Sequence, residues 1–162
     1  SVQGPGRVSG TAKLLISTLN KSYPPLIKNN ISIVDIDDCT DGHYQALLNG
    51  EDNQRYVLNS FQTTSEELLS KLKSLSEWSG RPMYIPKLGL KIIAPLGDLY
   101  KLLSNSTPLI CSESARVLTH GHIYDGSKAG DKLNINYIDL DMFIEKTINW
   151  LIDENYVNLK KI

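Results

Sequence analysis

Two tyrosine–lysine pairs have the spacing that a proton-transfer site needs. They are Tyr124–Lys128 and Tyr156–Lys160, and in each the ammonium group could lower the pKa of the phenol. A chain with eight tyrosines and many lysines contains such spacings by chance. The two side chains must also share one helix to reach one pocket, whereas Asp125, inside the first pair, is a typical helix cap. We therefore predict that neither pair is catalytic.

Two further groups of side chains have the chemistry of metal ligands. One is acidic and the other combines histidine with cysteine: Asp35, Asp37, Asp38 and Asp41, and His120 and His122 with Cys111 or His43. No glycine-containing loop gathers the carboxylates, and helix capping and dipole compensation account for two of them. No second close pair of ligands accompanies the histidines. We therefore predict no metal site, and expect the histidines in a polar pocket lining or hydrogen-bonded in the core.

Three glycines near the start suggest a phosphate-binding loop: Gly4, Gly6 and Gly10. Such a loop follows a strand, so that the free N–H groups of the next helix point at the phosphate. Only three residues precede Gly4, and Pro5 has no backbone donor. These residues therefore predict a turn that leads into the first helix. Arg7 and Arg116 could each clamp a phosphate or carboxylate, or could be solvated on a helix surface.

The hydrophobic pattern places these residues on alternating strands and helices. Runs rich in β-branched and aromatic residues predict strands at 31–36, 55–58 and 83–86. Helical spacing predicts helices at 8–19, 37–50, 64–80, 112–118, 125–133 and 139–154, and another over 87–103 that Pro95 interrupts. Asp37 and Asp38 are the expected caps of the second helix, and Thr64 with Glu67 forms a capping box. The alternation indicates an α/β fold that is short of strands.

Composition limits the kind of protein. The 162 residues are 41% hydrophobic, with 17 Lys+Arg against 18 Asp+Glu and a formal net charge of −1. These values are typical of one globular unit, residues 1–162, and give no electrostatic case for a nucleic acid or an anionic membrane. Cys39 and Cys111 lack the Cys-x-x-Cys spacing, which favours reduced thiols. We therefore expect a cytoplasmic protein with neither a nucleic-acid nor a membrane partner.

The order of four segments resembles a known family. They are Ser1–Arg7, Val34–Cys39 with Gly42-His43, Arg55–Leu58, and Tyr124–Ala129. In this order they resemble the second half of the extended short-chain dehydrogenases, most closely the NAD-dependent epimerase/dehydratase and dihydroflavonol-reductase-like group. The resemblance covers nearly the whole chain. It implies a C-terminal substrate lobe plus late sheet strands of a Rossmann-type fold, without the N-terminal nucleotide-binding half.

The resemblance also implies roles for individual residues. Ser1 and Val2 would lie beside the nicotinamide end of the cofactor, and Gln3 and Arg7 would lie toward the substrate pocket. Arg116 lies near the place where sugar-nucleotide epimerases have an arginine that binds phosphate. The Asp125–Ala129 segment would be the start of a helix with a structural role. The Tyr124–Lys128 spacing would then follow from this helix start and not from catalysis.

The family's catalytic residues have no counterpart in these 162 residues. Its glycine-rich loop, catalytic serine and Tyr-x-x-x-Lys helix would all lie upstream of Ser1, so we expect no catalytic residue and no cofactor for this chain alone. The intact protein would bind NAD or NADP and oxidise or reduce a carbinol or carbonyl carbon of a small-molecule substrate. The substrate could be a sugar nucleotide, a ketone or an alcohol. A homodimer is compatible with the family.

Two other hypotheses remain open at this point. The chain could be a non-catalytic binding or regulatory module derived from this fold, which works through a partner surface. Alternatively, the nucleotide-binding half could be a separate polypeptide, which would then copurify with this one.

Overall fold

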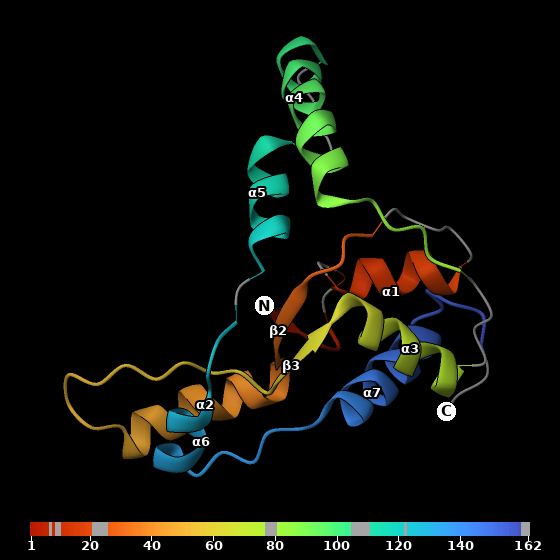
Figure 1. Cartoon of the computed structure of the whole chain (residues 1–162). Coiled ribbons are helices and arrows are strands. Elements are labelled where there is room, and N and C mark those ends of the chain that lie inside the picture. Colours follow the sequence, from red (N-terminus) through yellow and green to blue (C-terminus); the bar gives the residue numbers. More distant parts are fainter. Residues whose placement is uncertain are drawn as a thin grey trace.

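The computed structural model describes residues 1–6, 8, 11–20, 26–76, 81–104, 111–121 and 123–159. Its described strands form one small mixed sheet in the order β1-β2-β3 (Figure 1). These are β1 (Val2–Gln3), β2 (Asn30–Asp35) and β3 (Phe61–Thr64). β1 runs parallel to β2 with Gln3 opposite Asp35, and β3 runs antiparallel to β2 with Phe61 opposite Ile33. The α/β class expected from the sequence is confirmed.

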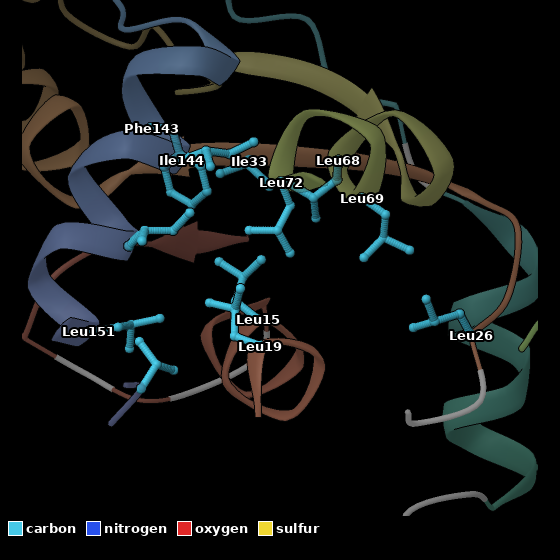
Figure 2. Close-up of a cluster of buried hydrophobic side chains, with 12 residues drawn as sticks. Leu15, Leu19, Leu26, Ile33, Leu68, Leu69, Leu72, Phe143, Ile144 and Leu151 are labelled. Carbon is cyan, nitrogen blue, oxygen red and sulfur yellow. The ribbon is translucent and has the colours of Figure 1, made fainter. Parts of the chain in front are cut away.

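Three helices enclose the main core with the sheet: α1 (Thr11–Leu19), α3 (Ser65–Ser76) and α7 (Leu140–Asp153). Each repeats leucine or isoleucine at helical spacing, so one side of each helix is apolar. Figure 2 shows that these faces converge below β2. The buried members from the helices and β2 include Leu15, Leu19, Ile33, Leu68, Leu72, Phe143, Ile144, Ile148 and Leu151. Within the described residues, no helix is both long enough and apolar enough to traverse a membrane.

Two other helices form a smaller cluster at one end of the sheet. α2 (Ile36–Asn49) packs against α6 (Ser127–Leu133), and Ala129, Leu133 and Ile135 are buried there. A Cβ atom at Gly126 would lie 2.6 Å from the Asn59 carbonyl oxygen, so only glycine allows this close approach. The segment before β3 is thereby held against the start of α6.

The remaining helices form a pair that extends away from the sheet (Figure 1). α4 (Lys87–Ser104) packs mainly against α5 (Ser112–His120). Buried aliphatic side chains of both helices pack there with Ile27: Leu90, Ala94 and Ala115.

Several predicted boundaries were wrong. Residues 55–58 form no strand, because Tyr56 and Leu58 pack against the α6 cluster without a neighbouring strand, and the strand is Phe61–Thr64 instead. The segment around Tyr84 makes only an isolated bridge to Leu26 rather than joining the sheet. α4 continues through Pro95, which is exposed, so the carbonyl left without a helical donor can be hydrated.

The predicted caps are partly confirmed. Thr64 accepts a 3.1 Å hydrogen bond from the backbone N–H of Glu67, which is one half of a capping box, whereas the Glu67 carboxylate accepts the Thr63 hydroxyl at 3.0 Å. The cap of α2, however, is Asp35 rather than Asp37 or Asp38, because the helix begins closer to the strand than expected. At Tyr23–Pro25 the two prolines predict an extended or turn segment, and these residues lie outside the described ones.

Candidate functional site

The carboxyl ends of two parallel strands form the candidate site. β1 ends at Gln3 and β2 ends at Asp35, and these two residues lie opposite each other. In sheets with parallel strands, ligands bind beyond this end, where the chain leaves the strands for loops and helices. Both residues are polar and buried, with Gln3 6% exposed and Asp35 fully enclosed. Buried polar groups at such a position need hydrogen-bond partners.

One oxygen of Asp35 has a charged partner. Lys146 of α7 donates from its Nζ atom to Asp35 Oδ1 at 2.6 Å and to Asp37 Oδ2 at 2.6 Å. The same Asp35 oxygen accepts the backbone N–H of Asp37 at 2.9 Å, which caps α2. Burial lowers the pKa of Lys146, but the hydrogen bonds to both carboxylates outweigh it and hold that pKa above the usual value. The ammonium group therefore neutralises a carboxylate that water does not reach.

Among the described residues, two buried oxygen atoms at the strand ends have no hydrogen-bond partner. They are Asp35 Oδ2 and Gln3 Oε1. The amide nitrogen of Gln3 donates to the Ser1 hydroxyl at 2.6 Å, so its carbonyl oxygen is left without a donor. Such acceptors are matched by N–H or O–H groups of a ligand or of another polypeptide segment.

Gly4 closes one side of the site. It has a φ of +138°, and a Cβ atom there would lie 2.8 Å from Ile36 Cγ2 and 3.0 Å from Asp35 Oδ2. Any larger residue would therefore collide with the helix start and with the unpaired carboxylate oxygen. Glycine is required here both for the backbone conformation and for the space.

A serine hydroxyl ties the strand end to its surroundings. Ser60 Oγ accepts the backbone N–H of Asp35 at 2.9 Å and donates to Asp38 Oδ2 at 2.5 Å. The same Asp38 oxygen accepts the backbone N–H of Ile138 at 3.1 Å. These bonds join β2, α2, the segment before β3 and the segment before α7, so the strand end is rigidly held.

The residues that the resemblance assigns to the cofactor site lie near the carboxyl ends of β1 and β2. The backbone nitrogen of Ser1 donates to the Ser32 carbonyl at 2.9 Å. Val2 is 47% exposed at the edge of the sheet. Ser1, Val2 and Gln3 are thus brought together with Asp35, but their binding roles stay predictions.

The two predicted arginines do not extend this cluster. Arg7 lies outside the described residues. Arg116 is exposed on α5, which packs mainly against α4 rather than against the sheet.

The acidic side chains that have the chemistry of metal ligands make other contacts. Asp35 and Asp37 hold Lys146, Asp38 holds Ser60, and Asp41 accepts the Gln45 amide at 3.2 Å. Across the described part of the chain, no three His, Cys, Asp or Glu residues are grouped as metal ligands. Cys39 and Cys111 form no disulfide with each other, and His122 lies outside the described residues.

Of the two lysines in the tyrosine–lysine pairs, Lys128 lies within the described residues. Its Nζ atom donates to Gln54 Oε1 at 2.8 Å and lies 5.2 Å from the centre of the Tyr56 ring. Asp125 accepts the backbone N–H of Ser127 at 2.9 Å, and this bond lowers the pKa of the carboxyl. The interpretation of Asp125 as part of a structural helix start therefore fits its geometry. Lys160 lies outside the described residues.

Sequence reasoning missed Lys146 and Ser60. Lys146 lies next to the buried stripe of α7, and Ser60 lies in a segment with no periodic pattern. The only sequence signal was the acidic cluster itself, since a carboxylate at the end of a buried strand requires a cation nearby. Nothing in the sequence indicates which of the lysines supplies it.

A depression of about 820 Å³ lies between the segment before β3 and α6, away from the strand ends. Its lining is mainly amides, hydroxyls and carboxylates, including Asn59, Gln62, Asp131 and Asn134. None of the predicted site residues lines it.

No family model matches the sequence, and no curated protein matches it. Three solved structures with the same fold are the protein gox2253 (TM-score 0.77, 16% identity), a nucleoside-diphosphate-sugar epimerase from Pseudomonas aeruginosa (TM-score 0.74, 21% identity), and the UDP-glucuronic acid 4-epimerase from Bacillus cereus in complex with UDP-glucuronic acid and NAD (TM-score 0.65, 16% identity). The alignments cover 98%, 97% and 95% of this chain but 48%, 47% and 43% of those proteins. The chain therefore spans about half the length of the structures that it matches.

At these identities the likeness concerns the fold. The three-stranded sheet and its helices correspond to about half of an epimerase of this kind, as the resemblance to extended short-chain dehydrogenases implied. The structure thus has the fold of a partial extended short-chain dehydrogenase.

Proposed function

We propose that this chain forms the substrate pocket, and one wall of the nicotinamide site, of an NAD(P)-dependent oxidoreductase or epimerase/dehydratase. The substrate would be a carbinol or carbonyl compound such as a sugar nucleotide. The observation that carries this proposal is the pair of buried, unpartnered acceptors at adjacent strand ends, in a fold shared with NAD-bound epimerases. Acceptors of this kind suit the carboxamide of a nicotinamide or the hydroxyls of a sugar.

The residues present are compatible with a bound nicotinamide. The half-exposed Val2 offers an apolar surface for the ring, and Ser1 and Gln3 place polar groups beside it. When bound, the cofactor supplies a hydride donor or acceptor. Asp35 and its bonds to Lys146 and Ser60 hold the strand end in place, and Gly4 lets the backbone pass close to it. In this proposal Arg7 and Arg116 contribute to the substrate pocket.

The remaining half of the site would come from a nucleotide-binding half of the same fold. β1 is one of the two edge strands of the described sheet, and an edge strand presents backbone groups that another strand can pair with. The coding sequence upstream of Ser1 tests this directly. A glycine-rich loop followed by a Tyr-x-x-x-Lys helix is the expected result, whereas a start codon immediately before Ser1 would favour the module without catalytic function.

The isolated chain provides a second test. Residues 1–162 carry no candidate catalytic pair in the described part, so we expect no NADH oxidation with ketones or nucleotide sugars. Turnover above the buffer rate, followed by absorbance of the reduced nicotinamide, would show that catalytic groups are present in this chain and would contradict the proposal.

A further inference from the structure

The depression beside α6 contains a buried side chain that has no partner in the described part of the protein. Asn59, in the segment before β3, lines the depression and is only 8% exposed. Its side-chain amide makes no hydrogen bond with any described residue. Buried amides are almost always hydrogen-bonded, so an unpaired one at the wall of a cavity indicates a group that a ligand can match.

Backbone contacts fix the position of Asn59. A Cβ atom at Gly126, the first residue before α6, would lie 2.6 Å from the Asn59 carbonyl oxygen and 2.9 Å from its backbone nitrogen. After α6, Asn134 has a φ of +54° and turns the chain. The Tyr137 ring then packs against Gly130, where a Cβ atom would lie 3.5 Å from the ring. The walls of the depression are therefore set by close-packed backbone.

Both formal charges on the lining are negative. Asp125 and Asp131 line the depression, and among its described lining residues there is neither Lys nor Arg. Lys128 and Lys132, on the same helix, bond instead to residues in the range 51–55. A cleft lined by one sign of charge attracts ligands of the opposite sign. The lining therefore disfavours an anionic ligand and favours a cationic one.

The unpaired groups of the lining are suited to N–H donors. The side chains of Asp131, Asn134 and Asn136 have no hydrogen-bond partner within the described ranges, so their oxygen atoms are available as acceptors. Phe61 and Tyr124 also line the depression, and aromatic rings attract organic cations. The volume of about 820 Å³ lies within the range of small-molecule sites.

We propose that this depression binds an organic polyamine. An ammonium group donates up to three hydrogen bonds and accepts none, which matches the carboxylate of Asp131 and the amide oxygen of Asn59. Asp125 keeps one oxygen on the backbone N–H of Ser127, and its charge adds to the attraction. The site goes beyond the proposed oxidoreductase function, because neither Gln3 nor Val2 lines it.

Titration calorimetry of the 162-residue chain with spermidine tests the proposal. We expect saturable binding at one site, with an affinity that falls as the salt concentration rises, because salt screens the attraction to the carboxylates. Glucose, which has hydroxyl groups but no charge, should give no saturable heat. Binding of glucose without binding of spermidine would show that the depression recognises a neutral polyol and would overturn the proposal.

A substitution of Asn59 separates a binding role from a structural one. Asn59→Leu removes the amide with little change in shape. Because the amide has no partner in the described part of the protein, the variant should keep the wild-type midpoint of urea unfolding, while its affinity for spermidine falls about tenfold. A lower unfolding midpoint, or an unchanged affinity, would contradict the role given to this amide.

Two aspartates provide a matched pair for the charge. Asp131→Asn removes a carboxylate from the lining and should weaken spermidine binding about fivefold. Asp52→Asn removes the same charge from an exposed turn that does not line the depression, and should bind as wild type does. Equal affinities of these two variants would show that spermidine responds only to the overall charge of the chain.

The absence of saturable spermidine binding by the folded wild type would overturn the proposal outright, and circular dichroism confirms folding. The result is independent of the proposed nicotinamide site. Val2→Asp, at the strand ends, should bind spermidine with the wild-type affinity, so failure of one proposal is distinguishable from failure of the other.

Discussion

At the scale of single residues, the candidate site depends on how one buried carboxylate is compensated. Asp35 is fully enclosed, and Lys146, whose side chain is 30% exposed, is its charged partner. A buried charge that loses its partner is far more costly than an exposed pair that is broken. The site therefore depends on a residue that lies more than a hundred positions away in the sequence.

Replacing Lys146 tests this compensation. Lys146→Met should lower the free energy of unfolding by about 2–3 kcal/mol, since it leaves Asp35 unpaired inside the protein. Lys71→Met is the matched control, because Lys71 pairs with Asp141 and both side chains are largely exposed, and it should cost less than about 1 kcal/mol. Urea denaturation followed by circular dichroism measures both. Equal losses for the two variants would show that the Lys146–Asp35 pair stabilises the fold no more than an exposed ion pair does.

The same pair predicts a dependence on alkaline pH. The folded state raises the pKa of Lys146, so its stabilisation is complete below the unfolded lysine pKa of about 10.4 and is lost as pH rises through the higher folded value. The difference in stability between wild type and Lys146→Met should therefore shrink from pH 9 upward through this range. A difference in stability that stays constant with pH would contradict a stabilising ion pair at Lys146.

The glycine at the strand end provides a prediction with an internal control. Gly4→Ala should destabilise the protein by about 1–3 kcal/mol, because it combines a positive φ with a collision against Ile36 and Asp35. Gly6 has a φ of +100°, but a Cβ atom there would meet no other atom within 4 Å, so Gly6→Ala should show the backbone penalty without the collision. Thermal melts of the two variants give the comparison. A larger loss at Gly6 would contradict the described packing.

At the scale of elements, local signals predicted the helices better than the strands. The leucine spacing in α3 and the Thr64 cap before it can be recognised within a few residues of sequence, and both are present in the structure. β3 could not be placed, because a strand depends on a partner far along the chain: the apolar run at 55–58 packs on α6, while 61–64 pairs with β2. The segment around Tyr84 was predicted as a strand for the same reason, although it makes only an isolated bridge to Leu26.

The cap of α7 tests how much the last helix depends on one local bond. Asp139 accepts the backbone N–H of Met142 at 2.9 Å, so Asp139→Ala should cost about 1 kcal/mol. Asp139→Ser keeps an acceptor at this position and should stay within a few tenths of wild type. Chemical denaturation distinguishes the two. An alanine variant as stable as the serine variant would show that α7 is held by its core contacts alone.

At the scale of the whole molecule, the sequence predicted the kind of fold but not the assembly of the site. The order of four weak segments indicated part of an extended short-chain dehydrogenase, and the solved structures have that fold. The grouping of Gln3 with Asp35 could not be predicted in detail, because it depends on the register of β1 with β2. The exposure of α4 was also hidden, since periodicity shows that a helix is amphipathic but not which way its face points.

The most direct test of the proposed function is NADH binding by the full-length product of the gene that encodes this chain, followed by nicotinamide fluorescence. Val2→Asp places a carboxylate where the proposal puts the nicotinamide, and Val57→Asp makes the same change at a side chain of matched exposure. The proposal predicts saturable binding by wild type and by Val57→Asp, and about tenfold weaker binding by Val2→Asp. Equal affinity of both variants, or no saturable binding by the folded full-length protein, would contradict it.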